Sequence, residues 1–95
     1  MVRINWTDQA IFDLINIAEF IAKDSKKYAR YTVKNIQERV RQLKLFPTSG
    51  KVVAEVEEIE IRELNFGNYR VIYKIYSSTR IDVITVHHSA RQLKL

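Results

Sequence analysis

Charged residues in the second half of the chain could form an anion-binding site. If Ile61 shares one face of a β-hairpin with Tyr69 and Tyr73, the opposite face gathers three cations around one carboxylate. These four residues are Glu60, Arg62, Arg70 and Lys74. Guanidinium groups present paired N–H donors to phosphate or carboxylate oxygens, so the pattern predicts an anion-binding patch. The alternative is a solvated sheet face whose charges pair across strands, each pair contributing roughly 0.2–1 kcal/mol.

Two adjacent histidines close the last expected strand. They are His87 and His88, and Arg91 follows them. An imidazole beside basic residues could act as general base or acid in phosphodiester chemistry. Neighbouring side chains of a strand point to opposite faces, so the two rings cannot readily hold one metal ion, and no metal site is expected. The alternative is a surface histidine that makes a structural hydrogen bond.

Most of the excess positive charge lies between residues 25 and 46. This segment holds seven basic residues and one acidic residue, Glu38. At about 100° per residue, four of the cations fall in one stripe, away from the apolar positions of the same helix. They are Lys27, Arg30, Lys34 and Arg41. Such a stripe could bind an acidic partner or phosphates, or it could keep an exposed helix soluble.

Hydrophobic periodicity predicts the elements that position these groups. A short alternating stretch precedes capping residues and two amphipathic helices, and alternating strands rich in Val, Ile and Tyr follow the loop after Pro47. The expected elements are a strand at 2–6, helices at about 8–23 and 25–46, a hairpin turning at 65–68 and a strand at 81–86. Residues 51–58 fit either an irregular strand or a loop. The helices should form an antiparallel hairpin that covers one face of a small antiparallel sheet, an α+β fold of order β-α-α-β-β-β. Its large aromatic side chains are expected in the core. They are Trp6, Phe12, Phe20 and Phe46.

Length and composition limit the classes of function. The 95 residues form one domain, 1–95, too small for a large enclosed active site. A net charge of +5 favours acidic partners, and the absence of Cys fits a reducing cytoplasm. No secretory leader or membrane span is expected. The chain has no Gly-rich phosphate loop, HExxH or GxSxG motif, so standard hydrolase and nucleotide-binding classes have no support and no cofactor is expected.

The residue pattern resembles the RelE/ParE superfamily of type II toxins over essentially the whole chain. The resemblance rests on Trp6-Thr7 before a helix with Asp13-Leu14, on Phe46-Pro47 with Gly50, on Ile61-Arg62-Glu63-Leu64, on Gly67-Asn68-Tyr69-Arg70-Val71-Ile72-Tyr73, and on Val86-His87-His88 with Arg91. It implies the same small sheet covered by a helical hairpin. It also implies a cognate antitoxin, whose acidic C-terminal segment wraps and neutralises the toxin.

The superfamily divides by target. RelE-like members cleave mRNA on the ribosome. ParE-like members are not ribonucleases and instead poison DNA gyrase. Arg70 matches an arginine of the RelE pattern, but Ser89 and Leu95 stand where that pattern has an arginine and a tail tyrosine. The resemblance therefore implies a ParE-like gyrase inhibitor, with a ribosome-dependent endoribonuclease as the alternative.

The gyrase-inhibitor and ribonuclease hypotheses involve overlapping residues. In the ribonuclease alternative, the catalytic candidates are Arg62, Arg70, His87, His88 and Arg91. In either reading, the candidates for binding the target or the antitoxin are Arg62, Arg70, Lys74, His88 and Arg91, together with Lys27, Arg30, Lys34 and Arg41.

Overall fold

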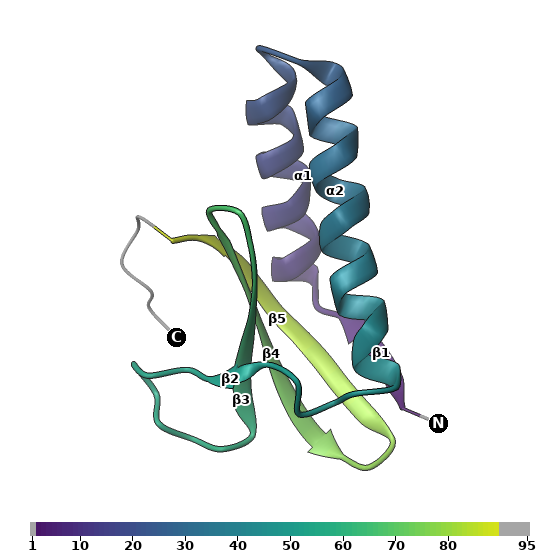
Figure 1. Ribbon diagram of the computed structural model, residues 1–95, viewed down its shortest axis with the longest axis vertical. Helices are drawn as coiled ribbons and strands as arrows, with labels where there is room; N and C mark the ends of the chain where they lie inside the picture. The colour runs from purple at the N-terminus through teal and green to yellow at the C-terminus, as the bar shows by residue number, and fades with distance from the viewer. Residues whose placement is uncertain (1, 90–95) are drawn as a thin grey trace.

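The computed structural model describes residues 2–89, and the elements follow the expected order (Figure 1). In chain order they are β1 (Arg3–Trp6), α1 (Asp8–Ala22), α2 (Lys26–Arg41), the short 3-10 helix η1 (Gln42–Lys44), β2 (Lys51–Val52), β3 (Ile61–Phe66), β4 (Tyr69–Ser77) and β5 (Arg80–His88). The α+β prediction is confirmed. The second helix ends earlier than predicted, because its last turn tightens into η1.

The strands form one sheet in the order β1-β5-β4-β3-β2. Neighbouring strands from β2 to β5 are antiparallel, as predicted, but β1 lies parallel to β5. The two hydroxyl N-caps fix the entry to each helix. Thr7 Oγ1 accepts a hydrogen bond from the Ala10 N–H, and Ser25 Oγ accepts one from the Tyr28 N–H at 3.0 Å.

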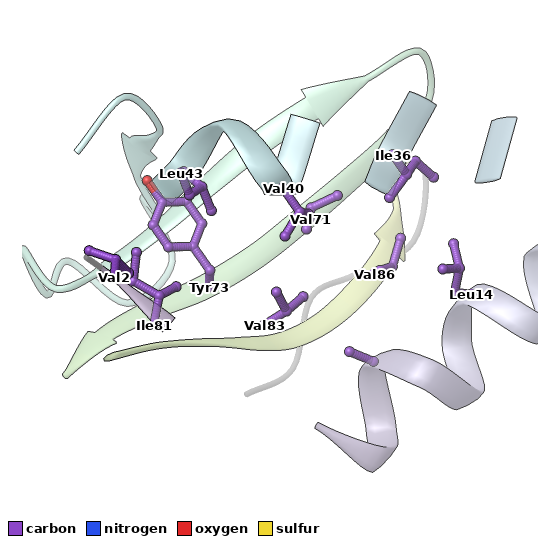
Figure 2. Close-up of a cluster of buried hydrophobic side chains, with 11 residues drawn as sticks. Val2, Leu14, Ile36, Val40, Leu43, Val71, Tyr73, Ile81, Val83 and Val86 are labelled. Carbon is purple, nitrogen blue, oxygen red and sulfur yellow. The ribbon is translucent and has the colours of Figure 1, made fainter. Parts of the chain in front are cut away.

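The core lies between the helical hairpin and one face of the sheet. Figure 2 shows Leu14 of α1 and Ile36 of α2 directed toward side chains of β4 and β5. Near the connection between α1 and α2, the two helices extend beyond the sheet (Figure 1). Three aromatic residues predicted for the core are exposed instead, so that prediction is wrong for them. They are Phe12, Phe20 and Phe46, whereas Trp6 is partly buried against the core.

The segment between β2 and β3 covers part of the other face of the sheet. Val53 and Ile61 pack with Ile72 of β4 in a second apolar cluster, and Val56 contacts it. This explains why β4 and β5 are apolar on both faces. Among residues 2–89, no helix is long and apolar enough to cross a membrane.

Gly50 lies where the chain passes close to β3 and β4. Its N–H donates to the hydroxyl of Tyr73 at 3.0 Å, and that hydroxyl donates to the Pro47 carbonyl at 2.8 Å. A Cβ atom on Gly50 would lie 2.6 Å from both the Glu63 carbonyl oxygen and the Tyr73 hydroxyl. We therefore expect Gly50→Ala to lower the free energy of unfolding by about 1–3 kcal/mol, measured by urea denaturation. Ser49→Ala, at the exposed neighbouring position, should leave it unchanged.

Candidate partner-binding surfaces

Arg70 lies between two carboxylates on the sheet face away from the helices. Its Nη1 and Nη2 donate to the two oxygens of Glu55 at 2.7 and 2.9 Å, and Nη2 also donates to Glu63 Oε2 at 2.5 Å. The Arg70 side chain is 13% exposed and that of Glu63 is 4% exposed. The guanidinium of Arg70 therefore joins the segment before β3 to the sheet, and its charge is neutralised within the protein.

The pKa values of this cluster reflect the same pairing. Hydrogen bonds from Arg70 lower the pKa of the Glu55 carboxyl to about 2. Burial raises the pKa of Glu63, but the hydrogen bonds from Arg70 and Asn65 outweigh burial, so the net shift is downward. The pKa of Arg70 rises above its ordinary value because both carboxylates hold its protons. All three groups stay charged near neutral pH.

Arg62 is on the opposite face of the sheet from Arg70. It lies opposite Tyr73 in the β3–β4 register, and it donates to the backbone carbonyls of Ile59 at 3.0 Å and Gly50 at 2.9 Å. Lys74 shares the face of Arg70, with its ammonium 4.8 Å from the centre of the Tyr76 ring. Glu60 precedes β3. The predicted cluster of Arg62, Arg70 and Lys74 around Glu60 is therefore wrong: its members are divided between the two faces.

The two histidines lie opposite different residues of β4. His87 pairs with Arg70, and His88 pairs with Tyr69. The His88 ring meets the Tyr69 ring edge to face, with centroids 5.5 Å apart. Arg91 lies outside the described residues. Within the described part of the chain, no group of three or more His, Cys, Asp or Glu side chains could hold a metal ion.

A groove runs along the outer side of the helical hairpin. Two adjoining hollows of about 430 and 480 Å³ share Ala18, Val33 and Gln37, so they form one groove between α1 and α2. Its floor is apolar, and two of its floor residues, Ile11 and Ile15, are 44% and 52% exposed. A third hollow of about 260 Å³ continues it toward β1. We call these three hollows the hairpin groove.

Basic residues of α2 line this groove. Lys26, Arg30 and Lys34 line the hollow of about 480 Å³, and Arg41 of α2 lines the third hollow together with Lys44 of η1. Arg30, Lys34 and Arg41 of the predicted stripe are thus brought to one groove, but Lys27 is not among its lining residues. Within residues 2–89, Arg30 and Lys34 form no ion pair. The sequence did not reveal the groove, because helical periodicity does not show how much of an apolar face, here including Ile11 and Ile15, the neighbouring helix covers.

A recess of about 660 Å³ lies between α1 and the ends of β4 and β5. Tyr69 and His88 line it from the sheet, and Asp13 and Phe20 line it from α1. Asp13 accepts hydrogen bonds from the Thr85 hydroxyl and the Val86 N–H, which connects α1 to β5. Apart from His87 and His88, which both line the recess, sequence reasoning missed this site, because its residues come from distant parts of the chain.

The described surfaces are open grooves on a small basic domain, which is typical of proteins that act by binding macromolecules. A profile of the family described as "ParE toxin of type II toxin-antitoxin system, parDE" matches residues 4–93, so the chain belongs to the ParE toxin family. It is a type II toxin, and a cognate antitoxin is its partner. The resemblance to the RelE/ParE superfamily, and to its ParE branch, is confirmed.

The fold is shared with a solved relative. A chain of the chromosomal ParDE TA system from P. aeruginosa superposes with a TM-score of 0.73 at 20% sequence identity. The match covers 93% of this chain and 96% of that chain. At this identity the likeness shows the fold. No curated protein matches the chain significantly.

Proposed function

We propose that this toxin inhibits DNA gyrase by binding it and does not cleave RNA. The observation that carries the proposal is the neutralisation of Arg70 by Glu55 and Glu63. A ribonuclease needs a cation free to stabilise the extra negative charge on phosphate in the transition state. Arg70 is held by two carboxylates, and Arg62 donates to backbone carbonyls. The charge of Arg70 is therefore not available for that role, and gyrase inhibition requires no such group.

Two assays on purified, antitoxin-free protein test the proposal. We expect it to block DNA supercoiling by gyrase and to leave ribosome-bound mRNA intact. Cleaved message with normal supercoiling would establish the RelE-like alternative instead. Expression of the toxin alone should arrest growth. A protein that merely sequesters an acidic partner should leave growth unaffected. Normal growth on expression would therefore contradict both toxin mechanisms.

The antitoxin is proposed to bind the hairpin groove through an acidic, amphipathic segment. The apolar floor can accept the apolar side of such a segment, and Lys26, Arg30 and Lys34 can pair with its carboxylates. A second copy of the toxin is a poorer occupant, because it would bring another set of cations against this one. Binding should be partly electrostatic and should weaken at high salt. The toxin, its antitoxin and gyrase would meet in the cytoplasm.

A further inference from the structure

A second surface of the toxin is built from aromatic rings. Tyr28 and Tyr31 of α2 are stacked with centroids 5.8 Å apart, and Tyr31 meets Phe66 of β3 at 6.2 Å. Phe66 pairs with Tyr69 across the β3–β4 hairpin, and Tyr69 contacts His88 of β5. Each ring thus touches or pairs with the next, so a continuous aromatic ladder crosses four elements. We call these five residues the aromatic ladder.

The α2 end of the ladder is exposed, its other three rings are half-buried, and the ladder is separate from the hairpin groove. Tyr28 and Tyr31 are 56% and 54% exposed. On α2 they lie on the flank next to β3, whereas the groove uses the flank next to α1. At its other end, the ladder opens into the recess of about 660 Å³ that Tyr69 and His88 line. The toxin therefore has two distinct surfaces on the two flanks of one helix.

The composition of the ladder favours a protein partner over a nucleic acid. A base stacks on the free face of a ring, and in the stacked pair of Tyr28 and Tyr31 one face of each ring is already covered. Phosphates need several cations, and no Lys or Arg lines the recess among the residues that the structure describes. Arg39 lies beside the ladder, with its guanidinium 5.9 Å from the centre of the Phe66 ring. Exposed Tyr and Arg side chains held in place by packing are the residues that dominate protein–protein binding energy.

We propose that the aromatic ladder and the adjoining recess bind the protein target of this toxin, and the inference rests on gyrase being that target. The ladder supplies rigid apolar contact area, and the recess accepts one side chain of the target beside the Asp13 carboxylate. Because this surface carries little charge, target binding should depend weakly on salt. Antitoxin binding at the hairpin groove, which has a basic rim, should depend strongly on salt.

The double variant Tyr28→Ala, Tyr31→Ala tests this inference. We expect the concentration needed for half-maximal inhibition of gyrase supercoiling to rise at least about tenfold, because two central aromatic contacts are lost. Both side chains are exposed on a helix, so the circular dichroism spectrum and the affinity for the cognate antitoxin should be retained. Tyr28→Phe, Tyr31→Phe keeps both rings and should keep most of the inhibition. Phe46→Ala removes an equally exposed ring elsewhere and should have no effect.

The outcomes separate the inference from the proposed function. If the wild-type toxin does not inhibit gyrase, the proposed function fails. If the wild type inhibits and the folded double alanine variant inhibits equally well, gyrase remains the target but the ladder is not its binding surface. A variant that loses binding to a single-stranded DNA oligonucleotide and keeps direct binding to gyrase would overturn the inference in favour of a nucleic-acid surface.

Discussion

Replacing Arg70 with methionine is expected to lower the free energy of unfolding by about 3 kcal/mol at neutral pH, because it leaves a buried carboxylate without its main partner. The Glu63 side chain is 4% exposed and keeps only the more distant Lys51 ammonium, at 3.8 Å, and the Asn65 amide, at 3.2 Å. A domain of this size has a total stability of roughly 5–10 kcal/mol, so the loss would be severe. Urea denaturation followed by circular dichroism measures it.

Two further variants test whether the unpaired Glu63 carboxylate causes this loss of stability. Adding Glu63→Gln to Arg70→Met removes the uncompensated charge and should restore much of the lost stability. Lys74→Met removes a cation from the same face of the same strand, and it should change the free energy of unfolding by less than about 0.5 kcal/mol. If Arg70→Met is as mild as Lys74→Met, Arg70 is not the structural link described here and the argument against the ribonuclease loses its basis.

The effect of Arg70→Met should also depend on pH, with a definite sign. In the wild type the pKa of Glu63 is lowered by folding, so its contribution to stability is present above the unfolded pKa of about 4.3 and is lost as the pH falls. In the variant, burial without Arg70 should raise this pKa instead. The carboxyl then becomes neutral in mild acid, so the difference in stability between wild type and variant should shrink from pH 7 toward pH 4. A constant difference over this range would contradict the assignment to Glu63.

The order of elements was predictable because it depends on local patterns. Thr7 and Ser25 have the hydroxyl side chains that cap helices, and both do so here. The 3.6-residue and two-residue periods located the helices and the long strands. The parallel pairing of β1 with β5 was not predictable, because the paired residues Arg3 and Arg80 are far apart in the sequence. Nothing in the pattern of a four-residue strand specifies its neighbour.

The predicted cluster of Arg62, Arg70 and Lys74 was wrong because it assumed a register of the β-hairpin that differs by one residue from the observed register. Phe66 pairs with Tyr69, so the hairpin turns through two residues, and Gly67 has the positive φ of 56° that such a turn favours. A two-residue turn places Ile61 opposite Lys74, not on the face of Tyr73. A shift of one residue moves every side chain of a strand to the other face. This is why Arg62 and Arg70 separate.

The carboxylate partners of Arg70 were also hidden from the sequence. Glu55 belongs to a stretch without periodicity, which could be placed only by the second apolar cluster around Val53 and Ile72. The aromatic ladder was missed for a related reason. Its rings come from four separate elements, which only the fold brings together. Phe20, near the end of α1, was expected in the core, yet the two helices extend beyond the sheet and leave part of their surface uncovered (Figure 1). Burial depends on where a helix ends relative to the sheet, which its own period does not reveal.

Reversing two charges on the hairpin groove is expected to weaken antitoxin binding by about 10–100-fold at low salt. The double variant Arg30→Glu, Lys34→Glu replaces two attractions with two repulsions, and both side chains are exposed on the groove rim. The loss should narrow as the salt concentration rises, because the screening length falls from about 10 Å at 0.1 M to about 3 Å at 1 M. Isothermal titration calorimetry with the cognate antitoxin measures the affinity.

A matched control separates the groove from the net charge. Lys23→Glu, Lys27→Glu makes the same change in net charge at two exposed lysines that do not line the groove. We expect this control to reduce the affinity only slightly, through long-range attraction. Equal losses in both double variants would mean that the antitoxin responds to the overall charge and not to the groove.

The groove variant Arg30→Glu, Lys34→Glu should still inhibit gyrase, because its substitutions lie on the flank of α2 away from Tyr28 and Tyr31. Loss of inhibition in a folded protein would mean that one surface binds both the antitoxin and gyrase.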